Sequence, residues 1–171
     1  MNRLNPTLLA AGFALAVGSL ANIAHADSPA DFVDEASAKG IAEIETSKMA
    51  LDKGSSPAIK SFAEQMIKDH TQANQELAQI AQQKELEVAD EAELMNKAKA
   101  MILQLRSGEN FDEAYANNQV VAHEQSVELF REQIADGEDP EIKAFATRTL
   151  PKLEHHLEMA RELAGNHQKS Q

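Results

Sequence analysis

Apolar residues recur every three or four positions in four long stretches of the chain, which is the spacing of one face of an α-helix. The stretches cover about residues 29–53, 57–81, 111–136 and 140–164. No stretch alternates apolar and polar residues between turn residues, as a half-buried strand would. The sequence therefore predicts an all-α protein built from four long helices.

Capping residues and glycines mark the ends of these helices. Residues suited to N-terminal caps come first in each stretch, and they are Ser28, Ser56, Asn110 and Asp139. Glycines are expected to end three of the helices, and they are Gly54, Gly137 and Gly165. Pro151 lies inside the last stretch and predicts a kink there, because proline removes one backbone donor.

A ten-residue pattern, G-x-x-P-x-I-K-x-F-A, occurs twice, starting at Gly54 and at Gly137. Each copy breaks one helix and begins the next, so the helices form two related hairpins. The connection between them, residues 86–110, is long and carries a short amphipathic stretch near 94–105. This connectivity predicts a ferritin-like four-helix bundle of two helical hairpins with a short extra helix in the crossover.

The first 26 residues have the layout of a secretory signal peptide. Arg3 precedes an apolar run from Leu8 to Leu20, and Ala24-His25-Ala26 is a suitable cleavage site. We expect export to the periplasm, a helical bundle over residues 27–165 and a polar tail over 166–171. The chain has no cysteine, so disulfides and thiolate metal ligands are excluded.

The net charge of −12 makes nucleic acid an improbable partner, because an acidic surface repels phosphates. We expect no membrane insertion once the signal peptide is removed. Other protein partners, including a homo-oligomer, stay open.

Three histidines fall in apolar stripes, one on each of three long helices: His70, His123 and His156. The first long helix carries Glu43 on a stripe of small residues. One inward-facing ligand on each helix would form a metal site in the bundle core. Imidazole nitrogens with one carboxylate suit zinc, copper or iron, and do not suit calcium or magnesium. His155 falls on a different face and is expected in solvent.

Other interpretations of these residues stay open. A buried histidine often hydrogen-bonds to a neighbour, for example His70 to Glu43. Asp69 is either a hydrogen-bond partner of the site or a surface charge, and the hydroxyl of Tyr115 is expected to satisfy a buried group. Two carboxylates near His123 are alternative ligands, Glu124 and Glu128.

No residue three positions before any candidate histidine is a carboxylate, so the Glu-x-x-His pattern of di-iron bundles is absent. No catalytic motif is found, and we predict no catalytic or organic cofactor-binding residues. Three hypotheses follow: a metal-binding bundle in stress protection, a structural or partner-binding bundle, and redox catalysis at the same histidines.

Several motifs together resemble the DUF4142 family, exported bacterial proteins with a ferritin-like fold. The matching residues are Phe32-Val33, Ala42-Glu43, Lys60-Ser-Phe-Ala, Met66-Ile-Lys-Asp-His70, Gly108-x-x-Phe111-Asp112-x-x-Tyr115, Ala122-His123 and Leu150-Pro151-x-Leu153-x-x-His156-Leu157. The resemblance implies the same fold and export. It also implies that Glu43, Asp69, His70, Tyr115, His123 and His156 belong to the family pattern, which favours His156 over His155. It supplies no activity.

Overall fold

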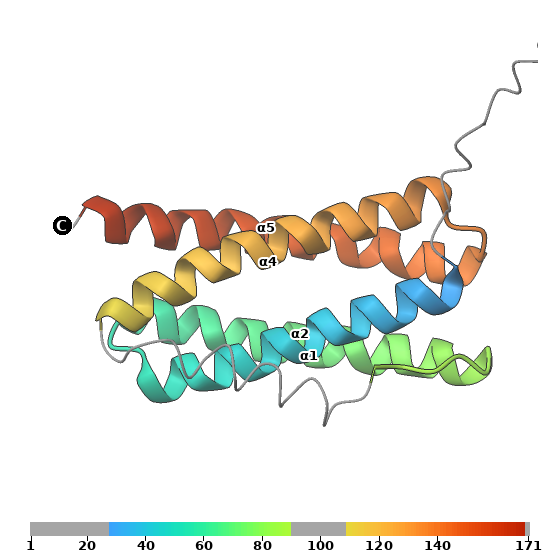
Figure 1. Cartoon of the computed structure of the whole chain (residues 1–171), viewed down its shortest axis with the longest axis horizontal. Coiled ribbons are helices and arrows are strands. Elements are labelled where there is room, and N and C mark those ends of the chain that lie inside the picture. Colours follow the sequence, from blue (N-terminus) through green and yellow to red (C-terminus); the bar gives the residue numbers. More distant parts are fainter. Residues whose placement is uncertain (1–27, 90–108, 170–171) are drawn as a thin grey trace, which may run out of the picture.

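The computed structural model describes residues 28–89 and 109–169, and over these residues the chain is a four-helix bundle without strands. The helices are α1 (Pro29–Lys53), α2 (Pro57–Gln83), α4 (Glu109–Asp136) and α5 (Pro140–Lys169). Helices α1 and α2 form one hairpin and α4 and α5 form the other, with α1 packed on α4 and α2 on α5 (Figure 1). The predicted all-α class and the two hairpins are confirmed.

Three of the predicted N-terminal caps are confirmed. The Ser28 hydroxyl accepts a hydrogen bond from the backbone N–H of Asp31 at 3.2 Å, and the Asp31 carboxylate accepts one from the Ser28 N–H at 3.1 Å. Ser56 caps α2, and Asp139 accepts the first backbone N–H groups of α5 at 3.0 Å. These contacts satisfy backbone donors that a helix start leaves without intrahelical partners.

Two predicted helix ends are wrong. Helix α4 is already helical at Glu109, so Asn110 lies inside the helix and is not its N-terminal cap. Helix α5 passes through Gly165 and ends at Lys169. Glycine permits a stop without forcing one, and nothing packs within 4 Å of where a Gly165 Cβ would lie. The helix also stays α-helical through Pro151.

Two predictions fall on residues that the structure does not describe: the signal peptide over 1–26 and the short crossover helix near 94–105.

Asp112 joins the two hairpins at one end of the bundle. This buried α4 carboxylate accepts hydrogen bonds from the Ser55 hydroxyl at 2.6 Å and the Ser56 N–H at 2.8 Å. Both donors lie in the turn between α1 and α2. The turn at Gly54 is therefore fixed by the second hairpin as well as by its own sequence.

Two apolar clusters fill the two ends of the bundle. The first cluster consists of Phe32, Val33, Ala36, Leu77, Ile80, Ala81, Val127, Leu129, Phe130, Ile142, Phe145, Ala146, Leu153 and Leu157. The second cluster consists of Ala50, Ile59, Phe62, Ala63, Met66, Phe111, Tyr115, Ala116, Ala160 and Ala164. The two copies of the repeated pattern contribute to different clusters: Ile59, Phe62 and Ala63 to the second, and Ile142, Phe145 and Ala146 to the first. Each copy thus supplies the core of one end.

Between the two clusters, the buried side chains are polar. On every helix, residues of one cluster come before this layer and residues of the other cluster come after it, although on α5 Leu157 of the first cluster directly follows His156. We call this set the polar layer, and it consists of Glu43, Asp69, His70, Gln119, His123 and His156. The position of the layer, at mid-length of the bundle, makes it the candidate functional site.

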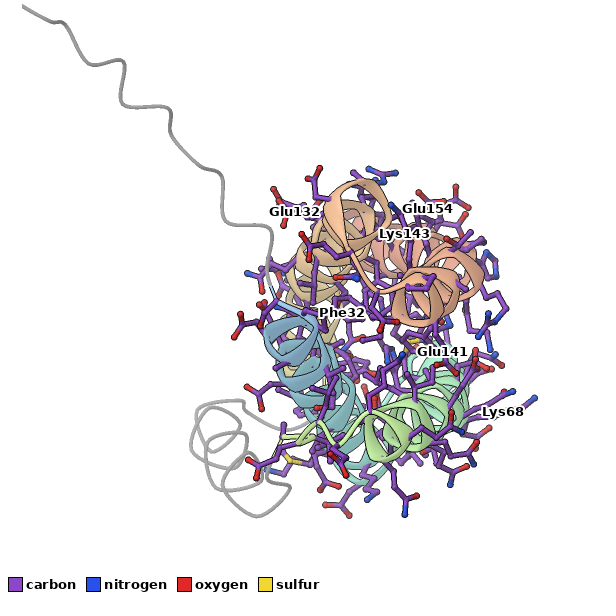
Figure 2. The ribbon with its side chains drawn as sticks, turned by 90° about the vertical axis from the view of Figure 1, so that its right-hand side faces the viewer. Phe32, Lys68, Glu132, Glu141, Lys143 and Glu154 are labelled. Atoms are coloured by element: carbon purple, nitrogen blue, oxygen red, sulfur yellow. The ribbon has the colours of Figure 1, made fainter. Side chains whose placement is uncertain are left out.

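Charged side chains cover the outside of the bundle. Figure 2 looks along the helices and shows Lys68, Glu132 and Glu154 pointing away from the centre. Within residues 28–89 and 109–169, no helix combines the length and the apolar character needed to cross a bilayer.

Candidate metal centre

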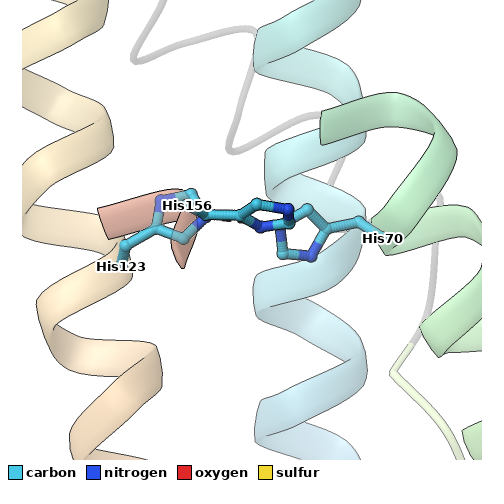
Figure 3. A group of neighbouring side chains, drawn as sticks. All are labelled: His70, His123 and His156. Carbon is cyan, nitrogen blue, oxygen red and sulfur yellow. Dashed lines mark hydrogen bonds between the residues drawn. The ribbon is translucent and has the colours of Figure 1, made fainter. Parts of the chain in front are cut away.

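Three histidine rings converge in the polar layer from three different helices, His70 from α2, His123 from α4 and His156 from α5 (Figure 3). All three are buried, and their ring centroids are 5.4–5.5 Å apart. One ring nitrogen from each histidine lies within 4.8 Å of the corresponding nitrogens of the other two. The structure thus brings together three of the four ligands predicted from the sequence.

Hydrogen bonds outside the triad orient two of the rings. His123 Nδ1 lies 2.9 Å from the backbone carbonyl oxygen of Gln119, so Nδ1 carries the proton and donates it. His123 Nε2 is then unprotonated, and it lies within hydrogen-bond distance of His70 Nε2, at 3.4 Å. His156 Nε2 lies 3.0 Å from Asp69 Oδ2. With Nε2 held there, the buried Nδ1 of His156 has no hydrogen-bond partner among the described residues.

Asp69 is part of the site and not a surface charge, because its side chain is only 5% exposed. Besides His156, its carboxylate accepts hydrogen bonds from the Gln65 amide and, at 3.2 Å, from Lys152 Nζ. Burial would raise the pKa of Asp69, but the hydrogen bonds from Gln65, His156 and Lys152 outweigh it and lower the pKa. An ionised carboxylate therefore faces His156.

The histidines are neutral at neutral pH. Burial lowers the pKa of His70 well below its ordinary value, and the neighbouring imidazoles lower it further. Burial lowers the pKa of His123 to about 4. For His156, burial again lowers the pKa, and it outweighs the opposing effect of Asp69. Neutral imidazole is the form that coordinates a metal ion.

Glu43, the fourth predicted ligand, is buried on α1 but does not belong to the group of mutually close ligand atoms. Burial raises its pKa to about 7, and the polar contact with the Gln119 side chain and the positive charge of Lys39 oppose this rise. The Gln119 amide therefore lies beside the Glu43 carboxyl group, in a contact that is too long or too bent for a well-formed hydrogen bond. Among the described residues, no hydrogen bond joins His70 to Glu43, and His70 Nε2 contacts His123 instead.

Tyr115 ties two helices together. Its hydroxyl lies 2.8 Å from the hydroxyl of Ser47 on α1, and both residues are buried. Burial raises the pKa of the phenol far above its ordinary value, so Tyr115 stays neutral. The expectation that this hydroxyl satisfies a buried group is confirmed.

The remaining candidates lie on the surface. Glu124 and Glu128 are exposed, and Glu124 pairs with Arg161 at 2.8 Å, so neither can join the triad. His155 is exposed, as expected for its face of α5.

A cavity of about 20 Å³ adjoins His70 in the bundle interior. All four helices line it, through residues such as Lys39, Asn74, Phe130 and Leu153. A space of this size holds about one water molecule. The layer of histidines is therefore not completely filled by side chains.

Gln119 is the residue of this site that sequence reasoning missed. It lies four residues after Tyr115 and four before His123, so helical spacing placed it on the buried stripe. The buried stripe predicted from the sequence consists of apolar residues and histidines, so it leaves out the polar Gln119.

A family model described as "Domain of unknown function (DUF4142)" matches residues 15–163, which is most of the chain. No curated protein and no solved structure matches the chain.

Proposed function

The chain belongs to the DUF4142 family, and from that premise we propose that its bundle binds one transition metal ion through His70, His123 and His156. The observation that carries this proposal is the convergence of three neutral imidazoles, with one nitrogen of each within 4.8 Å of the others. Bringing three such rings together in an apolar interior requires partners for their lone pairs. A shared cation is the partner that suits all three.

The distances support a shared ion. Two nitrogens bound to a tetrahedral zinc ion at 2.0–2.1 Å are about 3.3 Å apart. His70 Nε2 and His123 Nε2 are 3.4 Å apart. The third ligand would be His156 Nδ1, whose buried lone pair has no partner among the described residues.

The surroundings of the ligands also fit. Metal-bound histidines usually donate their other N–H to a carboxylate or a backbone carbonyl, which fixes the ring and raises its basicity. The Gln119 carbonyl fits this role for His123, and the Asp69 carboxylate fits it for His156. Three nitrogen ligands without thiolates favour zinc, copper or iron over calcium or magnesium.

A single ion is favoured over a pair. Paired iron ions in bundles are bridged by glutamates from Glu-x-x-His helices. Among the described residues, the cluster of mutually close ligand atoms contains histidines alone.

Thermal unfolding with added metal tests this proposal. Untagged protein, stripped with a chelator, should melt at a higher temperature with zinc, copper or iron(II), by mass action on the folded state. His70→Ala and His156→Ala should abolish the shift. His155→Ala is the matched control, because this exposed neighbour on α5 should leave the shift intact. A shift that is absent from the wild-type protein, or that survives in both triad variants, would overturn the proposal.

A structural or partner-binding bundle without metal is the second candidate. It is favoured by the contacts that the polar layer makes within the chain, between Asp69 and His156 and between His70 and His123. Such contacts could set helix register without any ion. In that case His70→Ala would change stability equally with and without added metal.

We also propose export to the periplasm and a role in handling metal ions under stress. The N-terminal pattern of residues 1–26 supports export. Protein from the periplasmic fraction should begin at Asp27, as N-terminal sequencing would show. Loss of the gene should increase sensitivity to excess copper or zinc, and complementation with the His70→Ala variant should not restore tolerance.

A further inference from the structure

Hydrogen bonds lead from solvent to the histidine triad along the seam between α2 and α5. The Lys152 side chain on α5 is 42% exposed, and its Nζ donates to Asp69 Oδ1 on α2 at 3.2 Å. The other carboxylate oxygen, Asp69 Oδ2, lies 3.0 Å from Nε2 of His156, whose side chain is 1% exposed. Lys152 and Asp69 therefore lie between solvent and a ligand of the proposed metal ion.

The other surroundings of the triad are less suited to the entry of a cation. His123 Nδ1 donates to the backbone carbonyl of Gln119, a buried residue of α4. The cavity beside His70 has a volume of about 20 Å³, and among the described residues that line it the only charged side chain is Lys39. A metal ion in this cavity would be repelled by a like charge, so the seam between α2 and α5 is the favoured route.

The Asp69 carboxylate can offset the cost of bringing a cation into the bundle. A cation loses its hydration in a protein interior, and a buried anion close by compensates part of that loss. In the metal-free protein, the ammonium group of Lys152 already occupies a position beside this carboxylate. An incoming metal ion must therefore compete with Lys152 for Asp69.

The charge of Lys152 also acts on the histidines. Burial is the main cause of the lowered pKa of His70 and of His156, and the positive charge of Lys152 lowers both pKa values further. A charge that opposes a proton on these rings also opposes a metal ion beside them. Moving Lys152 away from Asp69 should therefore make the triad more attractive to cations.

We propose that Asp69 is the entry site for the metal ion and that Lys152 covers it, so that a divalent cation displaces the Lys152 ammonium before it reaches the histidines. The flexible, exposed side chain of Lys152 can turn into solvent without a change in the helices. The cation then moves from the carboxylate to the histidines, of which His156 contacts Asp69 directly. This inference rests on the proposed function and adds to it a route and a residue that controls the rate of uptake.

Stopped-flow measurement of cobalt(II) binding to the chelator-stripped protein, followed by the visible absorption of the ion, tests the inference. Lys152→Met keeps most of the side-chain length and removes the charge, so the association rate constant should rise at least about threefold in about 0.15 M salt. Lys152→Arg keeps the charge and should bind cobalt at a rate close to that of the wild-type protein. Asp69→Asn should slow association, because it removes the anion of the entry site.

Lys68→Met is the matched control. Lys68 directly precedes Asp69, but its exposed side chain points away from the centre of the bundle (Figure 2). This variant also removes one positive charge, but it does not uncover Asp69. The association rate constant should therefore change by less than about 1.5-fold, since salt screens an exposed charge.

Two results would overturn the inference while metal binding stands. One is an association rate constant that is unchanged or lower in Lys152→Met. The other is an equal rise when Lys152→Met is added to Asp69→Asn, since Lys152 would then act at a distance and not by covering Asp69. If the wild-type protein binds no cobalt, this inference and the proposed function both fail.

Discussion

The ends of the bundle and its middle bury different kinds of side chain. At the ends, aromatic and aliphatic side chains pack against one another, as in the edge-on contact of Phe32 and Phe130 with centroids 5.2 Å apart. In the middle, buried imidazoles and the buried carboxyl groups of Glu43 and Asp69 replace them, and several polar atoms there lack partners among the described residues. The ends stabilise the fold, whereas the middle reduces its stability. Such a middle is typical of a binding site, since function and stability often conflict there.

Removing a large side chain from one end should have the largest effect on stability and none on metal binding. Phe32→Ala empties a fully buried position in the first cluster and should destabilise the protein by about 3–5 kcal/mol. The zinc-induced increase in melting temperature should persist. Val121→Ala is the control, because this side chain is 52% exposed and its loss should change stability by less than about 0.5 kcal/mol. Loss of the zinc response in Phe32→Ala would contradict the division between ends and middle.

Acid should act on the middle of the metal-free protein. The folded protein holds His123 neutral with a pKa of about 4, whereas the unfolded chain titrates near 6.5. The unfolded state therefore binds more protons between these values, and stability falls as the pH falls from 6.5 to 4. His123 alone accounts for about 3 kcal/mol, and His70 and His156 act in the same direction. Urea unfolding of the Glu43→Gln variant at pH 7.5 and 5 with chelator present would measure this, because that variant removes the opposing titration of Glu43. Equal stabilities at the two pH values would contradict the burial of the triad.

Glu43 should have the opposite pH dependence. Its pKa is about 7 in the folded protein and 4.5 in the unfolded chain, so the folded state holds the extra proton, and stability falls as the pH rises through this range. Glu43→Gln should therefore stabilise the metal-free protein at pH 8, by up to about 3 kcal/mol, and have little effect at pH 4.5. An equal effect of Glu43→Gln at pH 8 and at pH 4.5 would contradict the raised pKa of Glu43.

Asp69 should affect metal affinity more than stability. Asp69→Asn keeps the size of the side chain and removes the charge that faces His156, so zinc affinity should fall about 10–100-fold. Competition with a coloured chelator would measure the change. Asp52→Asn, an exposed substitution on α1, should have no effect. Unchanged zinc affinity in Asp69→Asn would show that Asp69 does not support metal binding by His156.

Tyr115→Phe should give the smallest change. It deletes the hydroxyl contact with Ser47 in the second cluster and should cost about 1 kcal/mol in unfolding free energy. Zinc affinity should be unchanged, because Tyr115 bonds to α1 and not to a triad histidine. A clear loss of zinc affinity in Tyr115→Phe would contradict this prediction and make Tyr115 part of the metal site.

The sequence predicted the helices well, because their information is local. The stripe Phe32, Ala36, Gly40, Glu43, Ser47 and Ala50 is buried throughout, polar members included. The misplaced ends at Asn110 and Gly165 are positions where the local signal permits a stop without requiring it.

The site was only partly predictable, because its contacts are distant in sequence. Helical stripes showed that His70, His123 and His156 face inward, but not that their nitrogens meet. The role of Asp69 depends on α5, which supplies His156 and Lys152 more than 80 residues later. Nothing beside Asp69 in the sequence indicates those partners.

X-ray absorption spectroscopy of the zinc-loaded protein tests the central claim most directly. Three buried imidazoles sharing one ion should give about three nitrogen neighbours at about 2.0 Å, together with the outer-shell scattering of imidazole rings. His156→Ala should lose one of them, and His155→Ala should match the wild-type protein. A spectrum dominated by carboxylate or water oxygens, without imidazole scattering, would contradict a metal centre in the middle of the bundle.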